Sequence, residues 1–230
     1  MNYFERFEKK FLISLSQKEK IKNKFVNIFK EEFQHGYSCY SLYFDDLNFS
    51  TLKQKQEGLT DRHKIRLRTY FHDMNDKINH WYLEIKSKKN NIVKKKKITF
   101  KNQEVKKNLL KRNYSFFSNN FFETSNTYYQ PAYITFYHRD AIMSDILPHC
   151  RITFDTNIRC FKYKHDLFGK KDINQDYILS PNTILLELKY TNFLPKFISD
   201  YFTYLNLEQV TFSKYVDGYE KNIINPINNY

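Results

Sequence analysis

Glycine is scarce in this sequence, with four residues among 230. The four stand far apart, at Gly36, Gly58, Gly169 and Gly218. A Walker loop and a dinucleotide-binding fingerprint both need clustered glycines, so neither motif is present. Any phosphate that this chain binds must therefore be held by side chains rather than by a glycine-rich loop.

Cysteines and long apolar runs are also rare. The three cysteines, Cys39, Cys150 and Cys160, are odd in number and lack regular spacing. This argues against a disulfide framework and fits a reducing cytosol. No run is long and apolar enough to span a bilayer, and the charged segment Met1–Lys10 lacks the apolar core of a signal peptide. We expect a cytoplasmic protein, and association with a membrane through a partner stays open.

Positive charge, in contrast, is abundant. The 38 Lys and Arg residues outnumber the 25 Asp and Glu residues, which gives a formal net charge of +13. This excess favours an acidic partner: nucleic acid, an anionic membrane or a polyphosphate. Hydrophobic residues make up 41% of the chain, enough for a sizeable core. Because we find neither an internal repeat nor a linker, we expect a single domain over residues 1–230.

Strand patterns dominate the sequence. Alternation of period two predicts eight strands, at Tyr40–Asp45, His63–Phe71, Trp81–Lys88, Ile92–Phe100, Tyr133–Ala141, Cys150–Ile158, Thr183–Thr191 and Val210–Val216. Helical spacing and capping residues predict helices over Ser16–Phe33, Asn102–Leu110 and Pro195–Leu207. Residues 111–129 and 163–182 are predicted as loops, and the Asn-rich tail from Asn222 is predicted to fray.

The same alternation gathers charged residues on one face of several strands. Successive side chains of a strand point to opposite faces, so Lys64, Arg66 and Arg68 share one face. Other predicted strands align charges in the same way: Glu84 with Lys86 and Lys88, Arg151 with Asp155, and Glu187 with Lys189. One such strand is typical of the solvated face of an antiparallel sheet. Their recurrence favours an α+β fold, an antiparallel β-barrel with flanking helices and a charged interior that holds a ligand.

The residue types in this interior point to phosphate. A guanidinium group binds phosphate oxygens in pairs and stays charged. Many cations facing one another in a low-dielectric interior repel strongly, and a bound polyanion relieves that repulsion. The interspersed carboxylates suit Mg²⁺ or Mn²⁺, which prefer oxygen ligands and bridge phosphates.

Nine short motifs follow one another along the chain, at Glu8–Phe11, Ser41–Asp45, Lys64–Tyr70, Leu83–Lys86, Val93–Lys97, Tyr137–Ala141, Arg151–Asp155, Leu186–Tyr190 and Phe212–Tyr215. In this order they resemble the vacuolar transporter chaperone (VTC) domain of polyphosphate polymerases, within the triphosphate tunnel metalloenzyme superfamily. Each motif is weak alone, but together they span nearly the whole chain.

The resemblance implies a tunnel of eight antiparallel strands that grips a triphosphate or a polyphosphate. It implies catalytic roles for Arg66, Arg68, Arg139, Arg151 and Lys214. It implies phosphate binding by Lys10, Lys64, Lys86, Lys95, Lys97 and Lys189. It also implies a Mn²⁺ or Mg²⁺ ion held by Glu187, with Glu8 and Glu84 as further ligands.

We therefore expect a metal-dependent polyphosphate polymerase whose partners are ATP and polyphosphate. Two alternatives stay open: a catalytically silent module that binds polyphosphate, and a hydrolase of tripolyphosphate or nucleoside triphosphates. Arg6 favours the silent module, because the wider superfamily has Glu at this position. Nucleic acid is not expected as a partner, since it would need an open basic face. A membrane-protein partner and the oligomeric state stay open.

The run Lys94–Lys97 divides between two faces. Lys95 and Lys97 are expected to face the ligand. Lys94 and Lys96 are expected to face solvent or a partner.

Overall fold

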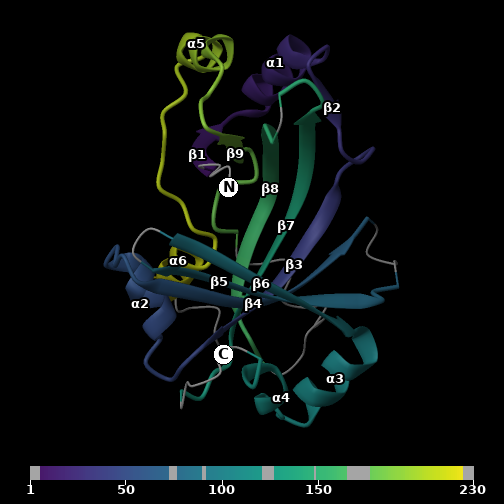
Figure 1. The fold of residues 1–230 in the computed structure, drawn as a ribbon, viewed down its shortest axis with the longest axis vertical. Helices are drawn as coiled ribbons and strands as arrows, with labels where there is room; N and C mark the ends of the chain where they lie inside the picture. Colours follow the sequence, from purple (N-terminus) through teal and green to yellow (C-terminus); the bar gives the residue numbers. More distant parts are fainter. Residues whose placement is uncertain are drawn as a thin grey trace. The chain divides into compact units, whose positions relative to one another are not determined.

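The computed structural model describes residues 6–72, 77–89, 92–120, 127–147, 149–164 and 177–224 of the chain. Within these ranges the protein is α+β with an antiparallel sheet, which confirms the predicted class (Figure 1). The chain divides into two compact units. Unit 1 comprises residues 1–38, 137–158 and 179–212, and unit 2 comprises residues 39–136, 159–178 and 213–230. The single domain expected over residues 1–230 stays a prediction.

The sheet is open rather than closed into a barrel. Eight strands follow the order β1-β9-β8-β7-β3-β4-β5-β6, and β2 pairs with β7. Within the described residues β1 and β6 are the two ends of this order, so the expectation of a closed barrel is corrected. The strands are β1 Arg6–Ile13, β2 Phe29–Glu31, β3 Tyr37–Asp45, β4 Arg62–Phe71, β5 His80–Lys89, β6 Ile92–Lys101, β7 Gln130–Ser144, β8 Arg151–Lys162 and β9 Ile184–Thr191.

Seven of the eight predicted strands are confirmed, as β3 to β9. The prediction of a strand at Val210–Val216 is wrong. The Val210 amide donates to the Lys10 carbonyl (2.8 Å), but the chain then turns into helix α6, Val216–Ile224. The turn is fixed by Asp217, whose carboxylate accepts from the Ser213 amide (2.8 Å) and whose own amide donates to the Ser213 carbonyl (2.9 Å).

Two of the three predicted helices are confirmed, as α3, Asn102–Leu110, and α5, Lys196–Tyr204. The helix predicted over Ser16–Phe33 is shorter: α1 spans Leu15–Phe25 and is capped by Ser14, whose side chain accepts from the Gln17 amide. The residues that follow pair as β2 with Ser144, Met143 and Ile142 of β7 instead of continuing the helix.

The remaining helices lie where none was predicted. They are α2, Ser50–Gln56, α4, Ser115–Ser118, and α6, which extends into the tail that was expected to fray. Residues 121–126 and 165–176 of the two predicted loops, and residues 225–230 of the tail, lie outside the described residues. A helix long and apolar enough to cross a membrane is not found in the part of the chain that the structure describes.

The core of unit 1 lies between its strands and helices α1 and α5. These two helices lie side by side (Figure 1), where the Phe25 ring contacts the rings of Phe197 and Tyr201. Leu186 and Leu188 of β9 are fully buried in the same cluster. The residues that alternate with them, Leu185 and Glu187, point to the other face of the strand.

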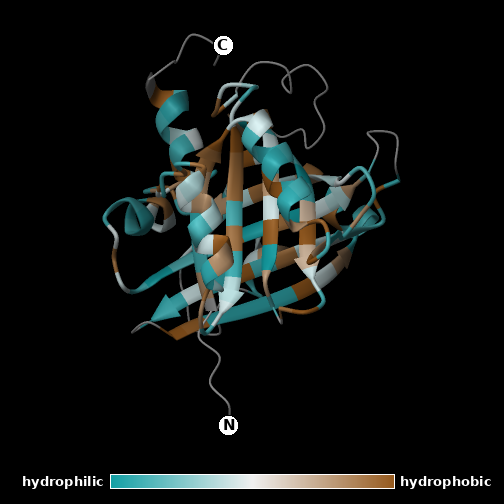
Figure 2. Ribbon diagram, turned by 90° about the horizontal axis from the view of Figure 1, so that it is seen from above, coloured by the Kyte–Doolittle hydropathy of each residue, from teal (hydrophilic) through white to brown (hydrophobic). Residues whose placement is uncertain are grey.

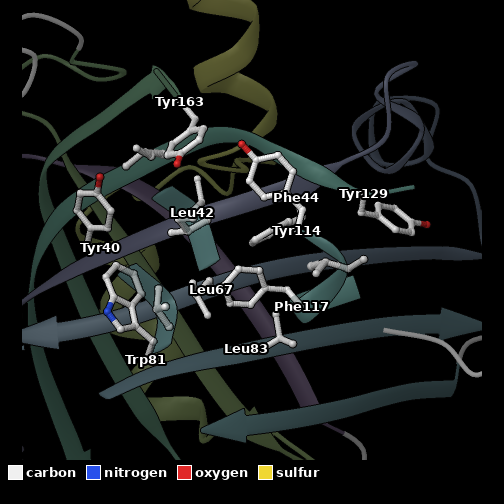
Figure 3. Packing of buried hydrophobic residues seen from close by; sticks show 14 of the residues in the cluster. Tyr40, Leu42, Phe44, Leu67, Trp81, Leu83, Tyr114, Phe117, Tyr129 and Tyr163 are labelled. Atoms are coloured by element: carbon white, nitrogen blue, oxygen red, sulfur yellow. The ribbon is translucent and has the colours of Figure 1, made fainter. Parts of the chain in front are cut away.

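The core of unit 2 packs against one face of β4 and β5. Leu67, Leu83 and Trp81 are fully buried there, together with Phe117 of α4 (Figure 3). These residues alternate with the charged residues of the same strands, and Figure 2 shows hydrophilic and hydrophobic residues alternating along the strands. Burial of one face therefore fixes which side chains the opposite face presents.

Two glycines with the same backbone conformation provide a test of the packing beside β7. Gly36 and Gly58 both have a φ of +68°. A β-carbon at Gly36 would lie 2.5 Å from the Arg139 carbonyl oxygen, whereas at Gly58 nothing lies within 4 Å. We expect Gly58→Ala to lower the free energy of unfolding by about 1 kcal/mol, the cost of the left-handed conformation. Gly36→Ala should cost about 1–3 kcal/mol more through overpacking. Urea denaturation of both variants measures this difference, and equal losses would contradict the close packing at Gly36.

Candidate anion-binding site

Six cations of unit 2 share one face of β4, β5 and β6. These six are the predicted site residues of the three strands, and we name them the cationic face: Lys64, Arg66, Arg68, Lys86, Lys95 and Lys97. Arg62 and Lys88 follow on the same face by register. The strand register places Lys64 opposite Lys86 and Lys86 opposite Lys95. Like charges directly opposite each other on neighbouring strands destabilise a sheet, so this row of three ammonium groups favours a bound anion.

Glu84 is the one acidic residue in β4, β5 and β6. Its carboxylate accepts from Arg66 Nε at 2.7 Å and lies 4.0 Å from Arg68 Nη1. Burial raises the pKa of Glu84, but the charges of Arg66 and Arg68 outweigh burial and lower it. Glu84 therefore stays ionised, and its carboxylate orients Arg66.

Tyr43 of β3 lies against the same cations. Its hydroxyl is 3.5 Å from Arg66 Nη1, and the Lys64 ammonium lies 5.4 Å from the centre of its ring. Burial alone would raise the pKa of this phenol, but the charges of Arg66, Lys64 and Arg68 lower it to about 7. Near neutral pH this phenol therefore exists as a mixture of its neutral and ionised forms.

A buried carboxylate holds the segment behind Tyr43. Asp45 is fully buried and accepts from the Thr51 hydroxyl (2.7 Å) and the Tyr215 hydroxyl (2.8 Å). It also accepts from the backbone amides of Asp46, Thr51 and Leu52. The Tyr215 ring stacks on that of Tyr43, with centroids 4.6 Å apart and planes 2° apart.

The segment before α6 reaches the cationic face. Lys64 Nζ donates to Ser213 Oγ at 3.2 Å, and Lys214 next to Ser213 is buried. The structure therefore places the predicted site residue Lys214 in the same unit as Lys64, Arg66 and Arg68.

Sequence reasoning placed Ser41, Tyr43, Asp45 and Tyr215 in family motifs but gave them no role in the site. Ser41 accepts from Arg68 Nε at 2.8 Å, so it positions a predicted phosphate ligand. The signal was available, because alternation in the strand at Ser41–Asp45 puts Ser41, Tyr43 and Asp45 on one face.

Unit 1 holds a second charged cluster, in which positive and negative residues alternate. The register of β1, β9 and β8 places Glu8 opposite Lys189, and Lys189 opposite Arg151. The next row places Lys10 opposite Glu187, and Glu187 opposite Thr153. Strands β1 and β9 thus pair opposite charges in both rows, although Lys189 and Arg151 are like charges across β9 and β8. The lysine row of unit 2 contains no such pair of opposite charges.

Arg139 of β7 is the most buried cation of this cluster. Its Nε and Nη2 donate to the two oxygens of Asp155, each at 2.6 Å, and Nη2 lies 3.4 Å from Glu187 Oε2. Burial lowers the pKa of Arg139, but the charges of Asp155, Tyr137 and Glu187 and the hydrogen bond to Asp155 together outweigh burial and raise that pKa. This two-point contact fixes the guanidinium plane and keeps the group ionised.

Two lysines surround the carboxylates of Glu187 and Glu8. Lys189 Nζ lies 2.9 Å from Glu187 Oε2 and 3.8 Å from Glu8 Oε2. Lys10 Nζ lies 3.3 Å from Glu8 Oε1 and 3.9 Å from Glu187 Oε1. Burial lowers the pKa of Lys189, although the charges of Glu187 and Glu8 oppose this effect.

Arg151 has partners of its own. Its Nη2 donates to the Tyr37 hydroxyl (2.9 Å), and its Nε donates to Glu32 (3.1 Å). Burial lowers the pKa of Arg151, but the hydrogen bonds to Glu32 and Tyr37, with the charges of these two groups, together outweigh burial and raise that pKa. Of the site residues predicted in unit 1, Lys10, Arg139, Lys189, Glu8 and Glu187 are joined by ion pairs, and Arg151 is held by Glu32 beside them.

The residues of unit 1 fit a divalent ion that is bound together with phosphate. Among the described residues no group of three His, Cys, Asp or Glu side chains is placed to hold a metal by itself. Mg²⁺ is usually bound through one or two carboxylates plus substrate phosphates, and Glu187 and Glu8 supply two. The hydroxyl of Thr153, buried opposite Glu187, makes no hydrogen bond within the described residues. A phosphate oxygen or a metal-held water would relieve this cost of roughly 1–3 kcal/mol. Glu84, the third predicted ligand, lies in unit 2, where Arg66 holds it.

Comparison with known proteins agrees with this antiparallel α+β architecture. The chain is similar to a candidate adenylate cyclase from Bacillus halodurans, with 11% identity and a TM-score of 0.50 over 90% of this chain and 92% of that chain. A second, from Vibrio parahaemolyticus, is 12% identical with a TM-score of 0.49, over 93% of this chain and 96% of that chain. At such identity the first likeness shows the fold alone. No curated protein sequence matches the chain.

The family is shown by the sequence itself. The profile of the VTC domain family matches residues 5–223, and the chain belongs to this family. The resemblance inferred from the nine motifs is therefore confirmed. Family membership supports a triphosphate-binding or polyphosphate-related protein.

The lowered pKa of Tyr43 predicts a titration that reports the charge of the cationic face. In free protein, the ultraviolet absorbance of tyrosinate should show one step with a midpoint near pH 7. Tripolyphosphate should move this midpoint upward, because a bound anion offsets the cations that stabilise the phenolate. Tyr43→Phe should abolish the step. A step that persists in Tyr43→Phe, or does not move with tripolyphosphate, would contradict the assignment.

Proposed function

We propose that this protein is a phosphotransferase that moves the terminal phosphoryl group of ATP onto a polyphosphate chain. The observation that carries this proposal is the row of Lys64, Lys86 and Lys95 directly opposite one another on three strands. Glu84, the one carboxylate of these strands, is committed to Arg66. A linear polyanion neutralises such a row at successive phosphates, and family membership supports the same ligand class.

The chemistry needs no nucleophilic side chain. The bond between the γ-phosphorus and the oxygen that bridges to the β-phosphate breaks, and its electron pair leaves with ADP. A terminal oxygen of the acceptor phosphate forms the new bond to the same phosphorus. Phosphoryl transfer depends mainly on positioning and on charge stabilisation, which arginine and lysine side chains supply.

The residues divide these tasks by unit. In unit 2, Arg66 and Arg68 would bind the reacting phosphates, since Glu84 and Ser41 already orient their guanidinium groups. Lys64, Lys86, Lys95 and Lys97 would bind further phosphates of the chain. In unit 1, Glu187 and Glu8 would hold Mn²⁺ or Mg²⁺, which neutralises phosphate oxygens when bound. Lys10, Lys189, Arg139 and Arg151 would carry the surrounding positive charge.

A second candidate function is binding of polyphosphate without turnover. It is favoured by the state of Glu187, whose carboxylate is already paired with Lys189 and Arg139. A metal would have to compete with both cations. The two functions share the cationic face and differ in whether ATP is consumed.

Removal of two lysines from the row tests anion binding. Lys86→Ala/Lys95→Ala should weaken the affinity for polyphosphate at least tenfold, because each lysine offers a charge-assisted hydrogen bond. The matched control is Lys94→Ala/Lys96→Ala, which removes the same charge from the opposite face of β6, where Lys96 donates to the Asn120 carbonyl. The control should change affinity much less. Equal losses in both variants would mean that net charge, and not the row, determines binding.

Turnover distinguishes the polymerase from its alternatives. Purified protein is incubated with ATP and Mn²⁺, and ADP, free phosphate and polyphosphate are measured separately. Polyphosphate formed together with ADP is the expected result. Phosphate without chains indicates a hydrolase, and tight binding without ADP indicates the silent module.

The metal role of Glu187 is tested in the same assay. Glu187→Gln should raise the Mn²⁺ concentration needed for half-maximal turnover at least tenfold, because one anionic ligand is lost. Asp200→Asn on the exposed surface of α5 is the control with the same change in charge. An unchanged metal requirement in Glu187→Gln would contradict metal binding at this residue.

A further inference from the structure

Two tyrosines continue the cationic face at one end. Tyr70 follows Arg68 by two residues on β4, so their side chains share a face. Tyr82 of β5 lies directly opposite Arg68 in the register. The two rings lie 5.9 Å apart at an interplanar angle of 48°. An aromatic pair thus adjoins the arginines that are expected to bind phosphate.

The rings are oriented toward cations and solvent rather than toward the core. Lys97 Nζ lies 3.8 Å from the centre of the Tyr82 ring, and the Arg68 guanidinium carbon lies 5.9 Å from that of Tyr70. Tyr70 is 37% exposed, whereas its neighbour Phe71 is buried in the core. Unit 2 therefore buries one aromatic residue at this point of β4 and presents the next one on the face that carries the charges.

Inorganic polyphosphate has no ring that could stack on this aromatic pair. A nucleotide has such a ring, because it carries a flat base at one end and phosphates at the other. Along β4 the backbone rises about 3.3 Å per residue, so Tyr70 and Arg66 are about 13 Å apart along the strand. This is the order of length of an extended nucleoside triphosphate, and the cations continue from Arg68 to Lys64 in the same direction.

We propose that Tyr70, with Tyr82 beside it, forms a base-stacking subsite for a nucleoside triphosphate whose phosphates lie on the cationic face. This inference rests on the proposed function, and it names how the donor nucleotide is distinguished from polyphosphate. Stacking uses the face of a base and not its hydrogen-bonding edge. The subsite therefore accepts any base, with purines bound more tightly than pyrimidines because they offer more stacking area.

The test compares two ligands that differ in the base. The affinities of ATP and of inorganic tripolyphosphate are measured for the wild type, Tyr70→Leu and Tyr70→Phe. Tyr70→Leu should weaken ATP binding about tenfold, the effect of losing one stacked base. It should leave tripolyphosphate affinity within about twofold, and Tyr70→Phe should retain ATP affinity because the aromatic face remains.

A matched control is Tyr204→Leu, which removes a tyrosine that is 76% exposed on α5 of unit 1. It should change neither affinity. If Tyr70→Leu weakens both ligands equally, or weakens neither, the base subsite is overturned while the proposed function stands. If wild-type protein does not bind tripolyphosphate, the proposed function is overturned, and the base subsite with it. The first outcome leaves the predictions for the lysine variants described above unchanged. Failure of the base subsite can therefore be distinguished from failure of the proposed function.

Discussion

Electrostatic repulsion among the lysines of β4, β5 and β6 destabilises the sheet of unit 2, so other contacts must hold these strands together. Lys64, Lys86 and Lys95 are held opposite one another because the alternate residues of the same strands are fixed in a core. Leu67 and Leu83, directly paired in the register and fully buried, stabilise the strands from the other face. Each buried leucine contributes roughly 1.5–3 kcal/mol, whereas a repulsive cross-strand pair costs under about 1 kcal/mol. The core can therefore sustain like charges directly opposite one another on the other face of these strands.

The two units differ in how many carboxylates accompany their positively charged side chains. In unit 1, carboxylates lie beside the cations: Asp155 beside Arg139, Glu187 beside Lys189, Glu8 beside Lys10 and Glu32 beside Arg151. This cluster is close to neutral by itself, and its groups are oriented before any ligand arrives. The strands of the cationic face carry Glu84 as their one acidic residue. Charge complementarity toward an anion is therefore concentrated in unit 2, and preorganised carboxylate oxygens are concentrated in unit 1.

Period-two alternation predicted most of this arrangement, because a strand with one buried face has its register fixed by the apolar residues. It correctly placed Lys64, Arg66 and Arg68 together and separated Lys95 from Lys94. It failed where other contacts override the alternating pattern. Residues 210–216 alternate like a strand, yet Asp217 bonds back to Ser213 and begins a helix. The helix expected to reach Phe33 ends at Phe25 because the residues beyond it pair with β7. The partner of β2 is distant in sequence, so no local window contains that contact. Asp217 and Ser213 are only four residues apart, but period-two alternation does not consider a hydrogen bond of this kind.

The placement of Asp45 and Tyr43 explains how an acidic group can adjoin the cations without cancelling them. The two oxygens of Asp45 accept from Thr51, Leu52, Asp46 and Tyr215, so this carboxylate is directed away from the cations and joins β3, α2 and the segment before α6. Tyr43, stacked on Tyr215, is the group that meets Arg66 and Lys64. A carboxylate there would be a permanent competitor of the ligand. The cations lower the pKa of the Tyr43 phenol to about 7, so near neutral pH it is partly ionised and partly offsets their charge. An anion placed beside these cations would raise this pKa and favour the neutral phenol. Unlike a carboxylate, the phenol can therefore lose its negative charge by protonation near neutral pH.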